Sequence, residues 1–450
     1  MPSSIYLSAA HKSSGKTVVS LGLCAALKEQ SLNVRPFKKG PDYIDPIWLS
    51  QASGSACYNL DFYNMSEIEI KQVFEQQSWD SDIAIIEGNK GLYDGMSVSG
   101  GDANADLAKL LNVAVVLVID TNGITRGVAP LVQGYQAFDQ SVNIAGVILN
   151  KVAGARHESK LISAIEHYTD IPVLGAIRRS KELIIDERHL GLVPANEIAK
   201  SSAFIQTAAK HVSDQVDLDR LSQLGQYSAE MIPLAQPKES GLTVAIAKDS
   251  AFGFYYQDDL SLFQSLGVEI VYFDTLRDQY LPKADALFIG GGFPEMQLEA
   301  LSNNTSLLQD IRSKINAGLP TYAECGGLMY LTRAISYQGR TYKMVGAIQA
   351  DTVMTPKPIG RGYVQLAPTK EHPWSNVSQT IYAHEFHYSK LENIDAKTRF
   401  AYKVLRGVGV DNNYDGVLVN NMLATYTHLR SVGGNRWVEQ FVNFIKDKQK

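Results

Sequence analysis

A cysteine set between a short strand and a helix limits the possible folds of this chain more than any other feature. Residues 320–323 have β-type composition, Cys325 follows, and Gly326-Gly327 opens a helical pattern over residues 328–335. A strand–turn–helix of this kind lifts the cysteine clear of its sheet and directs the next backbone N–H groups at whatever the sulfur attacks. We therefore predict that Cys325 is a nucleophile. The alternative is a small buried cysteine packed beside a turn.

A base and an oxyanion site for this nucleophile are predicted from two other segments. His428 ends a short strand and is the candidate base for Cys325. Arg430 stands two residues later, where such triads usually have a glutamate, so we predict a Cys–His dyad with its orienting group unknown. A strand over residues 286–289 breaks into three glycines. Backbone N–H groups of Gly291 and Gly326 are the predicted oxyanion donors.

Two antiparallel strands are predicted between the cysteine and the histidine, over residues 344–348 and 381–386. In the second strand His384 faces one side, while Glu385 and His387 face the other. Nothing nearby has the spacing of a zinc site. These side chains either face a substrate or form a satisfied polar network in the core.

A phosphate-binding loop is predicted near the N-terminus. A buried strand over residues 5–9 leads into a polar loop, and a helix follows over residues 18–30. Backbone N–H groups and the helix dipole would meet the phosphates, Lys16 would reach the outer ones, and the Thr17 hydroxyl would bind Mg²⁺. The residues predicted to form this loop are Ser13, Ser14, Gly15, Lys16 and Thr17. Because Ala10 replaces the usual first glycine, a Ser/Gly-rich turn capping an ordinary helix is the alternative.

Acidic residues follow the next two strands. Asp42 and Asp45 lie in a rigid Gly-Pro loop, Glu87 ends a strand over residues 83–87, and Asp94 lies in the glycine loop after it. Ligands bind at the carboxyl ends of parallel strands, and carboxylate and hydroxyl oxygens suit Mg²⁺. We predict a metal–nucleotide site here, with turn formers and helix caps as the alternative.

The N-terminal half continues as alternating strands and helices, which predicts a doubly wound α/β domain with a mostly parallel sheet. The further strands are expected at residues 113–118, 144–149 and 173–177, with helices at 127–138 and 158–168. Asn150-Lys151, after one of these strands, is a candidate contact for a nucleotide base. A second strand–helix series begins at residue 242. We predict domains at 1–212 and 242–450, joined by a linker over 213–241.

Length and composition set the limits. A chain of 450 residues exceeds one typical core, and a net charge of −5 without a basic stripe disfavours nucleic acid as a partner. Three cysteines without CxxC spacing suggest neither disulfides nor zinc. With no signal peptide and no apolar run long enough for a membrane span, we expect a cytoplasmic protein with no membrane partner.

The motifs resemble a known family. Residues 323–330, 290–295 and 426–428 resemble a class I glutamine amidotransferase domain, which has a flavodoxin-like fold. Residues 13–17, 37–46 and 87–95 look like the ATP site of a dethiobiotin-synthetase-type P-loop domain. Together, in this order, they resemble the cobyrinate a,c-diamide synthase family, in which the glutamate after the histidine is also missing.

This resemblance implies a reaction. Cys325 would attack the side-chain amide of glutamine, and the ammonia released would amidate the a and c acetate groups of a tetrapyrrole, activated by ATP and Mg²⁺. The metal would be held by Thr17, Asp42 and Glu87. The residues implied at the substrate and phosphoryl site are Asp42, Tyr43, Asp45 and Asp94.

The tetrapyrrole is left open by the sequence. Residues 10–14, 57–62 and 87–90 also look similar to a branch that amidates sirohaem, and hydrogenobyrinate and nickel-sirohydrochlorin offer the same acetate chemistry. A different hypothesis is a P-loop ATPase that uses an inactive glutaminase-like domain as a binding module. A CTP-synthase-like ligase fits poorly in size. Glutamine and the tetrapyrrole are the expected partners, and a homodimer is an open possibility.

Overall fold

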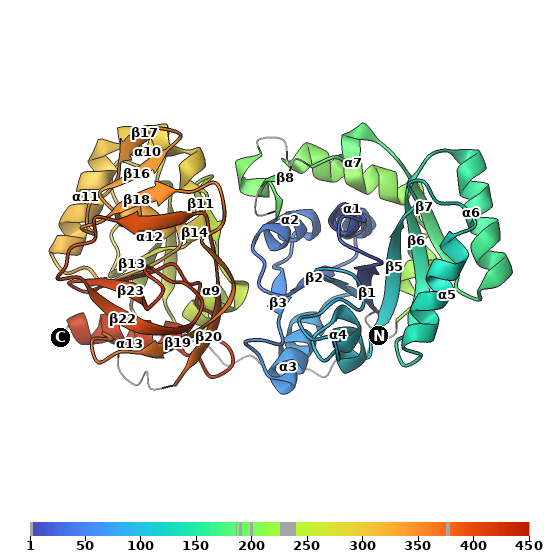
Figure 1. Ribbon diagram of the computed structural model, residues 1–450, viewed down its shortest axis with the longest axis horizontal. Helices are drawn as coiled ribbons and strands as arrows, with labels where there is room; N and C mark the ends of the chain where they lie inside the picture. Colours follow the sequence, from blue (N-terminus) through green and yellow to red (C-terminus); the bar gives the residue numbers. More distant parts are fainter. Residues whose placement is uncertain are drawn as a thin grey trace. The chain divides into compact units, whose positions relative to one another are not determined.

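The computed structural model describes residues 3–449, apart from 186, 189–190, 199–200, 226–239 and 375–378. The chain divides into two compact units, Met1–Pro233 and Leu234–Lys450 (Figure 1). Each unit has a β-sheet of its own with helices packed against it. The prediction of a two-domain α/β protein is therefore confirmed, while the boundaries at residues 212, 213, 241 and 242 stay a prediction.

A seven-stranded, wholly parallel sheet forms the centre of the first unit. In spatial order its strands are β3 (Tyr58–Leu60), β2 (Val34–Lys39), β4 (Ile83–Glu87), β1 (Ser3–Ala9), β5 (Ala114–Asp120), β6 (Ile144–Val152) and β7 (Val173–Arg178). The central strand β1 is buried along its whole length. The central strands of a parallel sheet are buried in this way because helices cover both faces of the sheet.

The strand order assigns the helices of this unit to two layers. The chain moves across the sheet in one direction from β1 to β3 and in the other from β3 to β7, so right-handed crossovers place α1 and α2 on one face and α3 to α6 on the other. Helix α7 packs along α1 (Figure 1). The helices are α1 (Lys16–Glu29), α2 (Ile44–Ser53), α3 (Glu67–Ser78), α4 (Asn104–Leu111), α5 (Val128–Phe138), α6 (Ala155–Tyr168), α7 (Ser201–Ser213) and α8 (Leu218–Ser222).

Short elements complete the first unit. They are the 3₁₀ turns η1 (Lys181–Leu183) and η2 (Ala195–Glu197) and the strands β8 (Glu187–Arg188) and β9 (Gly191–Leu192). Part of the predicted linker also belongs to this unit, since Val216 forms a β-bridge with Gly175 and α8 follows directly. Most of the rest of that linker lies outside the described residues.

A nine-stranded mixed sheet forms the centre of the second unit. In spatial order its strands are β12 (Glu269–Phe273), β10 (Thr243–Ala247), β13 (Ala286–Ile289), β15 (Thr321–Glu324), β24 (Met422–Thr425), β23 (Tyr414–Val419), β22 (Arg399–Arg406), β19 (Gly360–Pro368) and β20 (Ile381–His387). Pairing is parallel from β12 to β24 and antiparallel from β24 to β20.

Smaller elements surround this sheet. The remaining strands are β11 (Phe252–Phe254), β14 (Gly291–Gly292), β16 (Ala334–Tyr337), β17 (Arg340–Lys343), β18 (Asp351–Met354) and β21 (Ser389–Glu392). The helices are α9 (Gln257–Ser265), η3 (Pro294–Met296), α10 (Leu298–Asn303), α11 (Thr305–Asn316), α12 (Gly326–Leu331) and α13 (Trp437–Gln449).

Two predictions about elements here are wrong. The helix expected over residues 328–335 ends at Leu331, because Ala334 already belongs to β16, where it pairs with β17. Residues 344–348 form no strand and follow β17 as irregular chain. Their apolar side chains, including Met344, Val345 and Ile348, are buried in the core. The apolar run therefore indicated burial and not a strand.

The core of the second unit lies on both faces of its sheet. Along β10, Val244 and Ile246 belong to one apolar cluster, while Ala245 and Ala247 belong to the other. The alternation follows because successive side chains of a strand point to opposite faces. Trp437 of α13 packs in the first of these clusters. Burial on both faces makes β13, β15 and their neighbours a rigid support for loops at the strand ends.

Candidate active site

Cys325 occupies a strained turn between β15 and α12. Its φ is +48° and its ψ −103°, a backbone conformation that non-glycine residues rarely adopt. Its N–H donates to the Thr425 carbonyl at 2.7 Å, which ties the turn to β24. At Gly326, a Cβ would lie 2.9 Å from Cδ of Pro294 and 3.1 Å from Gly292. The structure therefore has the sharp turn that the sequence predicts at the cysteine.

His428 follows β24 and is buried close to this turn. Its N–H donates to the His384 carbonyl at 2.8 Å, in an isolated antiparallel bridge to β20. The two imidazoles stack with centroids 5.0 Å apart. Burial alone would lower the pKa of His428, but the charges of Cys325 and Glu324 close to the ring raise it to about 10. The structure thus places a protonated imidazole beside the sulfur.

The glycine loop before η3 lies against the same histidine. A Cβ at Gly291 would approach Cε1 of His428 to 2.5 Å. The neighbouring Gly290 N–H is already used, since it donates to Oη of Tyr255 at 3.0 Å. Gly326 lies next to this loop, as its contact with Gly292 shows. The predicted oxyanion residues are thus brought together around the thiol–imidazole pair.

The N-terminal loop that precedes α1 is held by side chains from neighbouring strand ends. Gly15 has φ +87° and leaves room for Asn150, because a Cβ there would lie 2.2 Å from Nδ2 of that side chain. Nδ2 of Asn150 donates to the Ser14 carbonyl at 2.9 Å, and Nζ of Lys151 donates to the Ser13 carbonyl at 3.0 Å. The loop therefore has the fixed backbone that a phosphate cradle needs.

Carboxylates from two strand ends meet at the first turn of α1. Oε1 of Glu87 accepts a hydrogen bond from the Thr17 hydroxyl at 2.8 Å. Nζ of Lys38 contacts the same oxygen at 2.9 Å and Oδ2 of Asp45 at 2.5 Å. Asp42 is farther from this ammonium, at 3.8 Å, and its Oδ1 caps α2. The structure thus brings together Thr17 and three carboxylates predicted after strands, Asp42, Asp45 and Glu87, and adds Lys38.

The remaining predicted residues lie around this cluster. Tyr43 is buried immediately before α2. Oδ2 of Asp94 accepts the Gly91 N–H at 3.0 Å and thereby closes its loop. Its charge also reaches Lys16, whose pKa falls to about 8 because of burial and the charge of Lys38, against the opposing pull of the carboxylates. A bound phosphate, as a nearby negative charge, would raise the pKa of this lysine again.

One carboxylate oxygen of this cluster is available to bind a divalent cation. Oε2 of Glu87 is buried and, within the described part of the chain, accepts no hydrogen bond. Mg²⁺ is usually held by one or two carboxylates, with waters and substrate phosphates completing its shell. Thr17 and Glu87 supply such a partial shell. Across the described residues, no set of three or more His, Cys, Asp or Glu side chains is arranged to hold a metal ion.

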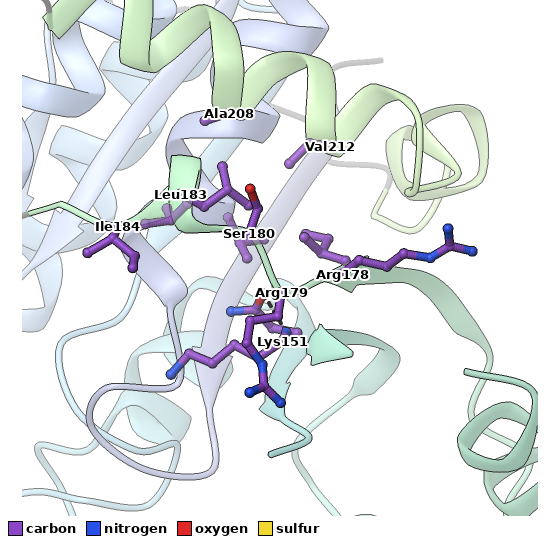
Figure 2. Close-up of a pocket in the computed structure, with 12 residues that line it drawn as sticks. Lys151, Arg178, Arg179, Ser180, Leu183, Ile184, Ala208 and Val212 are labelled. Atoms are coloured by element: carbon purple, nitrogen blue, oxygen red, sulfur yellow. Dashed lines mark hydrogen bonds between the residues drawn. The ribbon is translucent and has the colours of Figure 1, made fainter. Parts of the chain in front are cut away.

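A cavity of about 320 Å³ lies beside the phosphate-binding loop (Figure 2). Three basic residues line one side of it: Lys151 from β6, Arg178 at the end of β7 and Arg179 directly after β7. The apolar lining includes Val18, Ile177, Leu183, Ile184, Ala208 and Val212. Apolar walls with a few polar groups at one side are typical of a small-molecule pocket.

The polar residues of β20 divide between two roles. Glu385 accepts the N–H groups of Val408 and Gly409 at 2.7 and 2.8 Å, and Nδ1 of His387 contacts the Ser389 carbonyl at 2.8 Å. These two side chains take part in a buried polar network like the one predicted as an alternative, although Nε2 of His387 has no hydrogen-bond partner among the described residues. His384, on the other face, stacks on His428 instead.

Two residues of these sites escaped the sequence analysis. Lys38 is a buried lysine in the largely buried strand β2, two residues before the Gly-Pro loop. Glu324 is a buried acid at the end of a strand, directly before the cysteine. In each case the sequence places a charged residue in a strand that is expected to be buried. Charged side chains are rarely buried without a partner, so such a residue suggests a role in a site.

Comparisons with known proteins match both units. Residues 9–193 match a family model described as the CobQ/CobB/MinD/ParA nucleotide binding domain. Residues 243–435 match the CobB/CobQ-like glutamine amidotransferase domain. A curated relative from Magnetococcus marinus, named cobyrinate a,c-diamide synthase, is 44% identical over 99% of this chain and 97% of its own length. Relatives of the same name from Methanosarcina barkeri and Listeria innocua are each 38% identical, over 98% and 94% of this chain and 96% and 95% of their own.

The fold and the two sites define a glutamine amidotransferase joined to a nucleotide-binding domain, an enzyme of the carbon–nitrogen ligase class. More narrowly, the chain belongs to the cobyrinate a,c-diamide synthase family. The family resemblance seen in the sequence motifs is therefore confirmed. No helix among the described residues has the length and apolar character needed to cross a membrane.

Proposed function

We propose that this enzyme amidates the a and c acetate carboxylates of cobyrinate, with glutamine as nitrogen donor and ATP as the activating nucleotide. The observation that carries the proposal is the match to relatives of that name along almost the whole chain, which includes both sites. The same match favours cobyrinate over sirohaem as substrate, because none of these three relatives bears a sirohaem name.

The amidotransferase unit releases ammonia through Cys325. The thiolate attacks the amide carbon of the glutamine side chain, and a C–S bond forms as the carbonyl electrons move to oxygen. Backbone N–H groups of Gly291 and Gly326 stabilise that oxyanion. Protonated His428 gives its proton to the leaving nitrogen, and ammonia departs from a thioester. Water, deprotonated by His428, then cleaves the thioester to glutamate.

The nucleotide-binding unit activates the carboxylate. The backbone of residues 13–17 and the Lys16 ammonium hold the phosphates. Thr17, Asp42 and Glu87 would hold Mg²⁺, which when bound would supply positive charge next to the phosphates. A substrate carboxylate oxygen attacks the γ-phosphorus, ADP leaves, and an acyl phosphate results. Ammonia then attacks the acyl carbon, and phosphate leaves to give the amide.

The acidic cluster positions the reacting groups. Asp45, Tyr43 and Asp94 face the carboxylate and the transferring phosphoryl group, according to the family resemblance. Lys38 contributes to the same site, because its ammonium already bridges Asp45 and Glu87. In this position it neutralises the cluster before nucleotide binds and can stabilise phosphoryl charge afterwards. Burial would raise the pKa of Asp45, but Lys38 lowers it below its usual value, so this carboxylate stays ionised.

The cavity beside the loop takes the nucleotide base. Asn150 and Lys151 connect the cavity to the phosphate-binding loop. Both line the cavity, and both donate hydrogen bonds to backbone carbonyls of the loop. A planar base stacks well on apolar side chains, and the basic residues at one side of the cavity in Figure 2 suit a ribose or phosphate edge. A cytoplasmic location and a homodimer are further parts of this proposal.

The deciding experiment is mass spectrometry of the purified enzyme with ATP, Mg²⁺, glutamine and one tetrapyrrole at a time. The substrates to compare are cobyrinate, hydrogenobyrinate, sirohaem and nickel-sirohydrochlorin. We expect cobyrinate to gain two amides. If sirohaem is amidated and cobyrinate is not, the proposed substrate is wrong but the proposed reaction stands. ATP hydrolysis without glutaminase turnover would instead support the inactive-module hypothesis.

A further inference from the structure

The residue two positions after His428 does not provide the carboxylate that an imidazole base usually has. Arg430 is fully buried, and its Nε and Nη2 both donate to Oδ2 of Asp258, at 2.9 and 2.7 Å. Its guanidinium also lies over the ring of Tyr256, 4.9 Å from the centroid. This position therefore holds a cation that has its own counter-ion, so any carboxylate for His428 comes from elsewhere.

Glu324 is a carboxylate placed against the same histidine. It is the last residue of β15, 2% exposed, and its Oε2 lies 3.4 Å from Nδ1 of His428. Its other oxygen, Oε1, accepts the hydroxyl of Tyr322 at 2.6 Å and the Leu429 N–H at 2.8 Å. The carboxylate is thus fixed by two donors, one from its own strand and one from the residue that follows the histidine.

We propose that Glu324 is the positioning residue of His428, completing a Cys325–His428–Glu324 triad in which the nucleophile and the acid are neighbours in sequence. This inference rests on the proposed glutaminase function of Cys325. Glu324 orients the ring through Nδ1 and holds the adjoining backbone through Leu429. The Nε2 edge of the ring is then left to exchange protons with sulfur and with the leaving nitrogen.

Strand geometry explains how adjacent residues reach the histidine from different sides. Tyr322 and Glu324 share one face of β15, as residues two apart in a strand do, and they meet there through their side chains. At Cys325 the backbone leaves the strand with a positive φ, which turns the sulfur away from that face. Parallel pairing of β15 with β24 then brings the chain after Thr425, and so His428, alongside both residues.

The charged groups around His428 favour an imidazolium held by Glu324. His384 stacks on it but is neutral, because burial and the charges of His428 and Arg430 lower its pKa far below its usual value. Arg430 is paired with Asp258, so the groups that raise the pKa of His428 are Cys325 and Glu324. The position of this glutamate is the one a triad acid occupies in other cysteine and serine enzymes, where it stabilises the protonated base.

The test compares the pH profile of glutaminase kcat/KM in three forms of the full-length enzyme: wild type, Glu324→Gln and Tyr322→Phe. The glutamine side chain keeps an acceptor for Leu429 but removes the negative charge. We expect kcat/KM to fall about tenfold or more. The alkaline limb of the profile is the decline of kcat/KM at high pH. We expect the pH of this decline to fall by about one unit or more, because the imidazolium loses its proton more easily.

The Tyr322→Phe variant is the matched control. It removes one hydrogen bond to Glu324 but keeps the carboxylate, so its alkaline limb should coincide with that of the wild type. If Glu324→Gln shows the wild-type limb, or loses only thermal stability, Glu324 is structural and the inference is overturned. If Glu324→Gln does not fold, Glu324→Ala replaces it, because that variant also removes the negative charge, and an unmoved limb there has the same meaning.

Failure of the underlying function gives a different result. In parallel, alkylation of Cys325 by iodoacetamide at pH 7 is followed by peptide mass spectrometry in each form. A wild-type enzyme whose glutaminase survives Cys325→Ala, with Cys325 unreactive, overturns the proposed function. If Cys325 is reactive and essential, but the pH profile of kcat/KM is the same in wild type and Glu324→Gln, only the triad is overturned.

Discussion

Gly291 lies so close to His428 that a single added carbon would displace the imidazole. A Cβ on this glycine would stand 2.5 Å from Cε1 of the ring, and 3.3 Å from Cβ and Cδ2 of Phe254 on the other side. The ring cannot swing away freely, since it is buried between His384 and Glu324. The glycine loop and the base therefore form one packed unit around the sulfur.

Gly291→Ala is predicted to reduce glutaminase kcat/KM by about a hundredfold, because displacement of a catalytic group by about 1 Å has effects of that size. Steady-state glutamate release measures it. Gly134→Ala, in the exposed part of α5 where a Cβ meets nothing within 4 Å, is the control and should leave the rate unchanged. Equal rates in both variants would contradict the close placement of loop and base.

Cys325→Ala is predicted to abolish amidation driven by glutamine and to leave amidation driven by ammonium chloride. The reason is that the thiol is needed only to release ammonia, whereas activation of the carboxylate uses residues of the other unit. Product amides are counted by mass spectrometry with each nitrogen source. Cys24→Ala, at a buried cysteine of α1, should retain both activities. Loss of both in Cys325→Ala would mean that the cysteine is structural.

Asp45→Asn is predicted to leave glutaminase turnover intact and to suppress the ATP-dependent step. The variant removes the carboxylate that contacts Nζ of Lys38 at 2.5 Å, so the ammonium shifts and the phosphoryl site loses its fixed charge. ADP formation in the presence of cobyrinate measures the effect. Asp80→Asn, at a half-exposed carboxylate with a 3.5 Å contact to Arg35, should behave as wild type, since such surface pairs contribute little. Unchanged ADP formation in Asp45→Asn would refute the assignment.

Asn150→Ala is predicted to raise the KM for ATP several-fold with little change in kcat. It deletes the hydrogen bond that holds the Ser14 carbonyl, worth about 1 kcal/mol, and opens space beside Gly15. Nucleotide titration by calorimetry provides the measurement. Asn143 is exposed just before the same strand, so Asn143→Ala should not change binding. An unaltered KM in Asn150→Ala would show that the loop holds its shape without this contact.

Stability is predicted to fall as pH rises from about 7 to 10, through loss of the proton on His428. The pKa of this residue rises from 6.5 to about 10 in the folded state. The native form therefore holds a proton that the unfolded chain has released over this interval, and its stabilising effect is complete below 6.5 and lost through about 10. Urea midpoints of the wild type and His428→Asn at both pH values measure it. The variant should lose less stability than the wild type over the same interval.

Much of the fold was predictable because it depends on local patterns. The alternation of strands and helices, the phosphate-binding loop around Lys16 and the turn at Cys325 all follow from residue spacing over a few positions. The prediction over residues 344–348 was wrong for a physical reason. An apolar run reports burial, and buried irregular chain looks the same as a buried strand.

Local sequence was enough to predict Cys325 as nucleophile, His428 as base and the carboxylates after the strands, since each is marked by neighbours a few residues away. The contact of Glu324 with His428, and the bridge that Lys38 forms between Asp45 and Glu87, became visible only in the folded chain. These contacts join residues separated by up to 104 positions, 428 − 324, and depend on which strands pair and in what register. Strand order places side chains in contact across a sheet, and no local pattern in the chain encodes that order.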